Sequence, residues 1–219
     1  MNNFFHLPPF IPGSGWYDKH DSILFSVILR FGNKNFANLG SSFFDTPTIL
    51  TSYLEPGIEQ IISQIAILMV GGSCVPLDPA MPDSRLCFML QDLKINLTLT
   101  THQYQERVLP TGFVIIHENI LKNPRTKDLP NIHRCKSHRS HVLFTSGTTG
   151  TPKAVELEAR GILRIVVNPT YINLTATDKI ASICNPTFDV YLFEIWGALL
   201  NGASIVVIPR KIIIDPISI

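Results

Sequence analysis

The chain has 219 residues, of which 45% are hydrophobic and 16% charged, so it can form a substantial core and is not disordered throughout. Its 18 basic and 17 acidic residues leave a net charge of +1 and form no basic cluster of the kind that binds nucleic acid. No amino-terminal signal peptide is visible, and the longest apolar stretch, residues 61–70, is too short to span a bilayer. The four cysteines are widely scattered. We therefore expect a cytoplasmic chain with reduced thiols and neither a nucleic-acid nor a membrane partner.

Residues 1–52 carry no sustained hydrophobic period. The segment starts irregularly with several prolines and glycines, and residues 32–47 are rich in Gly, Asn and Ser. We leave residues 1–52 unassigned and expect them to be poorly packed, whereas residues 53–219 form the recognisable domain.

Helical and strand patterns alternate from Glu55 onward. Apolar residues recur at helical spacing over residues 58–69, and Gly71-Gly72 follows as glycines do past a helix end. A second helix begins near Pro82-Asp83, because proline is tolerated in a first turn and an acidic residue is favoured there. Two later helices are expected over residues 160–167 and 190–200.

Short apolar segments between these helices predict buried strands over residues 97–100, 113–116, 142–145, 180–183 and 204–208. The alternation predicts an α/β fold with a mostly parallel sheet flanked by helices. Ligands of such sheets bind beyond the carboxyl ends of the strands, which is where the strand over residues 142–145 ends.

A loop rich in hydroxyls and glycines follows that strand and is suited to hold a polyphosphate. Glycine lets the backbone approach an anion, hydroxyls donate hydrogen bonds, and a lysine adds positive charge. An ordinary turn between two strands is the plainer alternative. A P-loop ATPase does not fit, because Thr151 and Pro152 separate the last glycine from the lysine. The candidate phosphate-binding residues are Thr145, Ser146, Gly147, Thr148, Thr149, Gly150 and Lys153.

This loop resembles the signature of the AMP-forming adenylating enzymes, which include acyl-CoA synthetases, luciferases and the adenylation domains of nonribosomal peptide synthetases. Two further stretches, residues 74–86 and residues 188–200, resemble the peptide synthetase branch more than an acyl-CoA synthetase-like ligase. The resemblance runs from about Leu54 to Pro209. It implies the partial N-terminal core of an enzyme that joins ATP and an amino acid into an aminoacyl-adenylate and releases pyrophosphate.

The resemblance also implies roles for particular residues. Residues 145–150 would bind the β- and γ-phosphates of ATP, which enters with Mg²⁺, and Lys153 would hold the leaving pyrophosphate as a catalytic residue. Ala154 departs from the glycine usual in the family, which restricts the backbone of the loop there.

Asp189 matches the aspartate that pairs with the α-ammonium of the substrate in amino-acid-activating members. A helix N-terminus suits such a carboxylate, but a plain N-cap is the alternative interpretation. Val190 and Phe193 match positions that line the amino-acid pocket, and simple core packing of the helix is equally compatible with their apolar character. The identity of the amino acid stays open.

Two histidines and a cysteine near residue 135, with His141, have side chains that ligate zinc. Interleaved Arg134, Lys136 and Arg139 would repel a dication, so we expect no metal site there. The residues concerned are His133, Cys135, His138 and His141.

The sequence does not contain the family's later elements for adenine, ribose and magnesium, or its C-terminal catalytic lysine. The chain is therefore expected to be inactive alone. It is either a fragment of an amino-acid-activating domain, with a complementary C-terminal polypeptide and a phosphopantetheine carrier protein as partners, or a noncatalytic remnant that binds only a phosphate compound or a partner.

Overall fold

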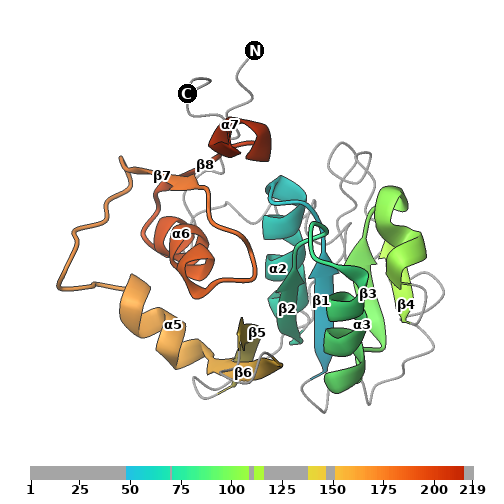
Figure 1. Ribbon diagram of the computed structural model, residues 1–219. Coiled ribbons are helices and arrows are strands. Elements are labelled where there is room, and N and C mark those ends of the chain that lie inside the picture. The colour runs from blue at the N-terminus through green and yellow to red at the C-terminus, as the bar shows by residue number, and fades with distance from the viewer. Residues whose placement is uncertain (1–47, 70, 109–110, 116–137, 147–150, 215–219) are drawn as a thin grey trace, which may run out of the picture.

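The computed structural model describes residues 48–69, 71–108, 111–115, 138–146 and 151–214. These residues form a six-stranded sheet with helices on its faces and, beside it, a smaller unit with a two-stranded parallel sheet (Figure 1). The architecture is α/β with a mostly parallel sheet, which confirms the fold class predicted from the sequence.

The main sheet begins with a strand that crosses the predicted domain boundary at residue 53, and its other five strands lie within the predicted domain. Its strands are β1 (Ile49–Tyr53), β2 (Ser73–Leu77), β3 (Leu97–Thr100), β4 (Gly112–Ile115), β5 (Arg139–Ser146) and β6 (Pro152–Glu158). They lie in the order β4-β3-β1-β2-β5-β6, and only β6 runs antiparallel to its neighbour. β5 is thus the last parallel strand before the sheet reverses direction.

Helix α2 (Ile58–Met69) packs on one face of the main sheet and ends at two glycines. Gly71 has a φ of 82°, and its N–H donates to the carbonyl of Leu68 at 2.9 Å. A Cβ at Gly72 would lie only 3.1 Å from the side chain of Leu50. The positive φ favours glycine at position 71, and a Cβ at position 72 would require its neighbours to shift by a few tenths of an ångström. Two glycines past the end of this helix agree with the sequence-based prediction.

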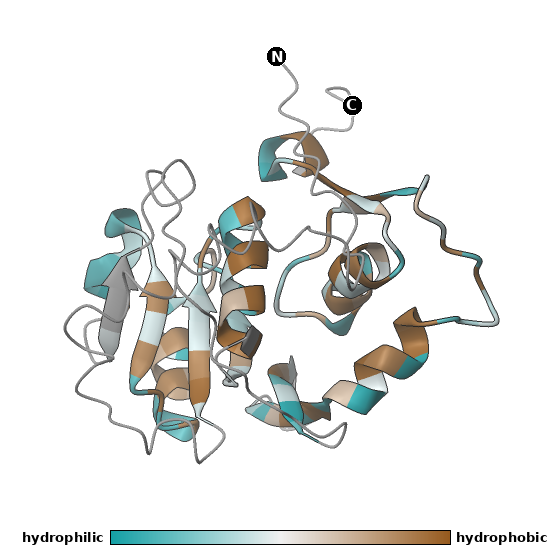
Figure 2. Cartoon of the chain, turned by 180° about the vertical axis from the view of Figure 1, so that it is seen from behind, coloured by the Kyte–Doolittle hydropathy of each residue, from teal (hydrophilic) through white to brown (hydrophobic). Residues whose placement is uncertain are grey.

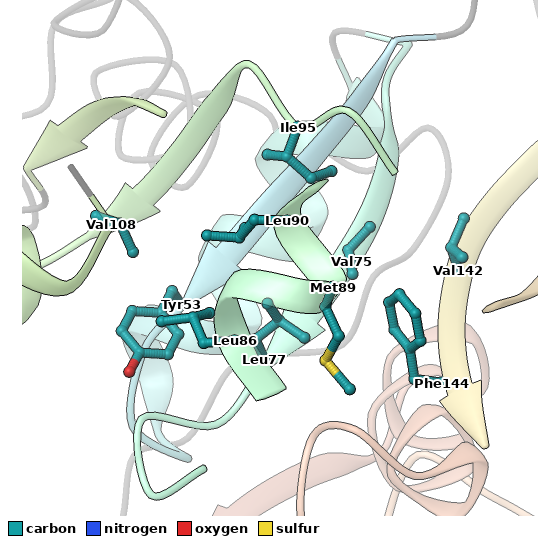
Figure 3. Packing of buried hydrophobic residues seen from close by; sticks show 10 residues of the cluster. All are labelled: Tyr53, Val75, Leu77, Leu86, Met89, Leu90, Ile95, Val108, Val142 and Phe144. Atoms are coloured by element: carbon teal, nitrogen blue, oxygen red, sulfur yellow. The ribbon is translucent and has the colours of Figure 1, made fainter. Parts of the chain in front are cut away.

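Helix α3 (Asp83–Asp92) covers the other face, followed after β3 by a 3₁₀ helix, η4 (His102–Val108). Figure 3 shows how Leu86, Met89 and Leu90 of α3 lie against the apolar side chains of β1, β2 and β5. Successive strand residues point to opposite faces, so Val75 and Leu77 face α3 while Cys74 faces away from it. The cluster contains Tyr53, Val75, Leu77, Leu86, Met89, Leu90, Ile95, Val108, Val142 and Phe144.

The smaller unit is arranged around an apolar helix. It consists of α5 (Ala159–Val166), β7 (Lys179–Ser182), α6 (Asp189–Leu200), β8 (Ser204–Val207) and α7 (Arg210–Ile214). α6 packs between α2 of the main unit and the β7–β8 pair, with Ile61, Tyr191 and Ile195 fully buried in one cluster. Figure 2 shows the apolar colouring of α2 and of much of α6, which explains how α6 can be buried on several sides.

Two sequence-based expectations about this architecture were wrong. Residues 49–52 were placed in an unassigned, poorly packed segment, whereas they form most of β1, and Leu50, Thr51 and Ser52 are buried. Residues 1–47 lie outside the described residues. β7 and β8 were expected in the main sheet, but within the described part of the chain they pair with each other in a separate sheet, and β6 was not identified as a strand.

Candidate active site

The β5–β6 hairpin places the flanks of the predicted phosphate loop at the carboxyl end of β5. Residues 142–144 are buried and fix the strand in the sheet, and Thr145 then pairs with Lys153 across the hairpin. Ser146 pairs in the same way with Pro152. The remaining residues predicted for this loop, Gly147, Thr148, Thr149 and Gly150, lie outside the described residues.

Thr145 and Lys153 are both exposed, so a hydroxyl and an ammonium are available to a ligand at this end of the sheet. Four described arginines pair with carboxylates, but within the described residues no carboxylate lies at ion-pair distance from Lys153. A lysine without a protein carboxylate beside it keeps its charge for an external anion. The arrangement therefore suits a phosphate group.

The start of α6 lies toward the same end of the sheet as this hairpin. The rings of His141 on β5 and Trp196 on α6 are 6.1 Å apart. Leu143 lies two residues after His141 on β5, and it packs in one core cluster with Leu192. Leu192 lies four residues before Trp196, nearer the start of α6. Two strand residues and four helical residues cover similar lengths, so α6 runs antiparallel to β5 and its first residue lies toward the carboxyl end of the strand.

Asp189 is the first residue of α6 and is exposed. Its Oδ1 accepts a hydrogen bond from the N–H of Val190 at 2.9 Å, whereas the cap position itself belongs to Phe188, which makes no side-chain cap bond. Asp189 is thus not the N-cap residue, although it does satisfy one of the free amides of the first turn. Its other carboxylate oxygen has no hydrogen bond to any described residue.

The two predicted pocket residues differ in their surroundings. Val190 is 53% exposed and contributes nothing to the core that the structure describes. Phe193 is half-buried, packs against a cluster that includes Leu143, and lies with its ring 6.3 Å from that of Tyr171. Core packing therefore accounts for part of the Phe193 surface, while the exposed side chain of Val190 lies beside Asp189 and is free to meet a ligand or another segment.

A polar cluster missed in the sequence connects the loop after β2 with the segment that leads into α6. Asp78 is almost fully buried and accepts hydrogen bonds from the Ala80 N–H at 2.8 Å and from the Asn185 side-chain amide. Arg210 of α7 donates to both carboxylate oxygens, at 3.0 and 3.3 Å. The only available signal was a carboxylate directly after a buried strand, which predicts no partner by itself.

Glu194 is a second buried carboxylate whose role was not predicted from the sequence. It lies on the apolar helix α6 with 6% exposure, and it accepts hydrogen bonds from the N–H groups of Ile183 and Cys184 at 3.1 and 3.2 Å. Burial raises the pKa of the Cys184 thiol to about 11, and a hydrogen bond with Glu194 adds to this effect. An acidic residue inside an apolar helical run was the signal that could have revealed it.

His141 is a core residue. It is fully buried, its Nδ1 lies 3.1 Å from the Ser140 hydroxyl, and burial lowers its pKa to about 3. His133 and Cys135 lie outside the described residues. Among the residues that the structure does describe, no three His, Cys, Asp or Glu side chains are grouped to hold a metal ion, and no helix is long and apolar enough to cross a membrane.

This combination of a parallel sheet, a loop at the end of its last parallel strand and an adjacent helix start defines the N-terminal subdomain of an adenylate-forming enzyme. A family model described as AMP-binding enzyme matches residues 49–217. The chain therefore belongs to the AMP-binding enzyme family.

Curated relatives point to the peptide synthetase branch of this family. The chain is 38% identical over 167 residues to the nonribosomal peptide synthetase asaC of Aspergillus flavus, covering 74% of this chain and 16% of asaC. It is 36% identical over 168 residues to malpibaldin synthetase of Mortierella alpina, covering 74% of this chain and 3% of that protein. A relative named aldehyde reductase lnaA, also from A. flavus, is 37% identical over 166 residues, covering 74% of this chain and 16% of lnaA. The chain thus spans a small part of the curated relatives it matches.

Solved structures show the same fold. The N-terminal subdomain of Klebsiella oxytoca NpsA, in complex with 3-hydroxyanthranilyl-AMSN, matches with a TM-score of 0.67 at 21% identity, covering 87% of this chain and 45% of that one. PA1221, an NRPS protein containing adenylation and PCP domains, matches in its holo form with a TM-score of 0.70 at 22% identity, covering 93% of this chain and 35% of that one. The matched region corresponds to the N-terminal part of an adenylation domain.

Proposed function

We propose that this chain supplies the pyrophosphate-binding and amino-acid-recognising part of an amino-acid-activating adenylation domain. The observation that carries the proposal is the placement of three groups at one end of the sheet: Thr145 and Lys153 on the hairpin, and Asp189 at the start of α6. The first pair suits phosphate oxygens, and the carboxylate suits an α-ammonium group.

In the proposed reaction, a carboxylate oxygen of the amino acid attacks the α-phosphorus of ATP. A new P–O bond forms, the bond between the α-phosphorus and the bridging oxygen breaks, and pyrophosphate leaves with the electron pair. Lys153 and the Thr145 hydroxyl would bind the leaving group, whose charge grows as the bond breaks, and Asp189 would fix the amino end of the other reactant. Val190 and Phe193 would contact the amino-acid side chain.

ATP would enter with Mg²⁺, as the resemblance to adenylating enzymes implies. The hydroxyl and ammonium groups of the hairpin suit ATP phosphates, while the described residues contain no carboxylate cluster for the metal. A carrier protein is the proposed acceptor of the activated amino acid, since PA1221 combines adenylation and PCP domains.

A noncatalytic role is the second candidate, because the activities named for the relatives differ. The relative named aldehyde reductase lnaA matches over nearly the same length as the peptide synthetases, so the named activity of a whole protein does not follow from this segment. In this second role the chain would bind a phosphate compound or a partner polypeptide without turnover.

Exchange of labelled pyrophosphate into ATP tests the proposal. We expect no amino-acid-dependent exchange by the isolated chain above that of Lys153→Ala, and measurable exchange once the C-terminal portion of a related adenylation domain is co-expressed with it. Exchange that stays absent for every amino acid in the co-purified complex, with pyrophosphate still bound, would favour the noncatalytic role.

A further inference from the structure

The segment between β7 and α6, residues 183–188, leads directly into Asp189 and is held by carboxylates at two places. At its start, the backbone N–H groups of Ile183 and Cys184 donate to Glu194 of α6. Further along, Asn185 donates from its side-chain amide to Asp78, which lies after β2 in the main sheet. The two carboxylates thus reach the same short segment from different units of the fold.

The side chain of Asn185 is hydrogen-bonded both to Asp78 and to the residues that follow Asn185 in the chain. Its Oδ1 accepts hydrogen bonds from the N–H of Thr187 at 3.0 Å and from the Thr187 hydroxyl at 2.7 Å. The backbone carbonyl of Asn185 accepts from the N–H of Phe188 at 3.0 Å. Since one amide group binds Asp78 with its nitrogen and Thr187 with its oxygen, the orientation of Asn185 determines where the chain turns toward Asp189.

Asp78 is suited to this task because burial leaves its carboxylate little freedom. Its side chain is 4% exposed, and its partners come from three places in the sequence: Ala80, Asn185 and Arg210. A buried carboxylate is stable only while charged or dipolar donors surround it, so each of these donors is held in turn. The loop after β2, the segment before α6 and helix α7 are therefore joined at one group.

We propose that Asp78 and Glu194 are positioning residues that hold residues 183–188 and so fix the point at which Asp189 begins α6. This proposal rests on the proposed function in one respect: residues 183–188 are held so that Asp189 can bind an amino acid. The contacts themselves involve no substrate.

Amide hydrogen exchange of the full 219-residue chain, read residue by residue by NMR without any ligand, tests the proposal. Donors face both carboxylate oxygens of Asp78, so Asp78→Asn places an amide nitrogen against a donor in either orientation and removes the negative charge. Glu194→Gln likewise removes the charge and one of the two oxygens that accept from the N–H groups of Ile183 and Cys184. We expect exchange at Thr187 in the first variant, and at Ile183 and Cys184 in the second, to rise about 10- to 100-fold, because hydrogen bonds to charged groups are the ones lost. Amides of α2 and α3 should keep their protection.

Asp83→Asn is the matched control, since Asp83 is an exposed carboxylate that pairs with Arg107 at 2.5 Å and has no contact with residues 183–188. It should leave exchange in that segment unchanged. Loss of protection in residues 183–188 with this variant, or equal loss across α2 and α3 with the other two, would show a general stability effect and overturn the positioning role.

Swapping the carboxylate of Asp78 and the amide of Asn185 between the two positions should restore the hydrogen bond. In the double variant Asp78→Asn with Asn185→Asp, the new amide donates to the new carboxylate, which still accepts from the N–H and hydroxyl of Thr187. Protection at Thr187 should return to within about threefold of the original chain, because the same hydrogen bond is restored in the opposite direction. Unchanged protection in the single variants, or no recovery in the double variant, would contradict the proposal. Because no substrate is present, either result leaves the assignment of Asp189 to the amino acid untouched.

Discussion

Lys153 lies directly opposite Thr145 across the β5–β6 hairpin, so an ammonium and a hydroxyl stand at the two flanks of one loop. Both side chains are exposed at the carboxyl end of the last parallel strand. In the proposed function, both side chains would contact the same anion, because cross-strand neighbours in an antiparallel pair lie within about 5 Å of one another.

Replacing Lys153 with alanine should weaken binding of pyrophosphate by roughly 10- to 100-fold, the effect of losing a charge-assisted contact. Isothermal titration of the isolated chain with pyrophosphate measures this directly. Lys179→Ala, which removes an exposed lysine from β7, is the matched control and should bind as the unmodified chain does. Equal weakening by both substitutions would reveal a general electrostatic effect instead of a contact made by Lys153.

Asp189→Ala should abolish amino-acid activation in the co-expressed complex. With an amino acid bound, the pocket would be partly desolvated, and an α-ammonium that has lost its partner there costs about 3 to 5 kcal/mol. Asp189→Asn separates the two roles of this residue, since the amide oxygen can still accept from the Val190 N–H but carries no charge. Exchange rates are compared for amino acids and for matching carboxylic acids that lack the amino group. If Asp189→Asn keeps the preference for amino acids, Asp189 supports only the first turn of α6.

His141 should make the chain less stable in mild acid. Burial lowers its folded-state pKa to about 3, below the unfolded value of 6.5, so the unfolded state binds a proton first as the pH falls. Its contribution to stability is complete above about pH 6.5 and declines between about pH 6.5 and 3, by about 2 kcal/mol at about pH 5. Urea unfolding at about pH 7.5 and 5 should show a smaller difference for His141→Phe than for the exposed-residue control His102→Asn.

Gln64 is fully buried in α2, and neither polar atom of its side chain has a hydrogen-bond partner among the described residues. Gln64→Leu should therefore raise the free energy of unfolding by about 1 to 3 kcal/mol, since a buried amide loses its bonds to water on folding. The midpoint of urea unfolding checks this, with the exposed Gln103→Leu as control. A lower midpoint for Gln64→Leu would show that its amide is bonded by a residue outside the described ranges or by buried water.

Local patterns predicted most helices and several strands of this chain. Residues 97–100 form β3 as expected, and the helices predicted over residues 160–167 and 190–200 appear as α5 and α6 with boundaries one residue earlier at the start. These elements are predictable because their apolar residues recur with a clear period and bury one face. The position of the hairpin loop was likewise indicated by its own residues.

Other features depended on partners far away in the sequence. Ile49–Tyr53 is an ordinary mixture of apolar and hydroxyl residues, and only pairing with β2 and β3 makes it a central strand. The antiparallel pairing of β6 and the separate β7–β8 sheet are choices of neighbour that no local pattern contains.

The sequence by itself determined the fold class, the family resemblance and the residue types available to a phosphate and an amino acid. Tertiary structure decided that α6 starts toward the end of the sheet where Thr145 and Lys153 lie, and that Asp78 meets Asn185 and Arg210 from far along the chain. The physical reason is that hydrophobic periodicity acts over one or two turns of chain. A buried carboxylate, by contrast, is satisfied by whichever donors the completed packing brings to it.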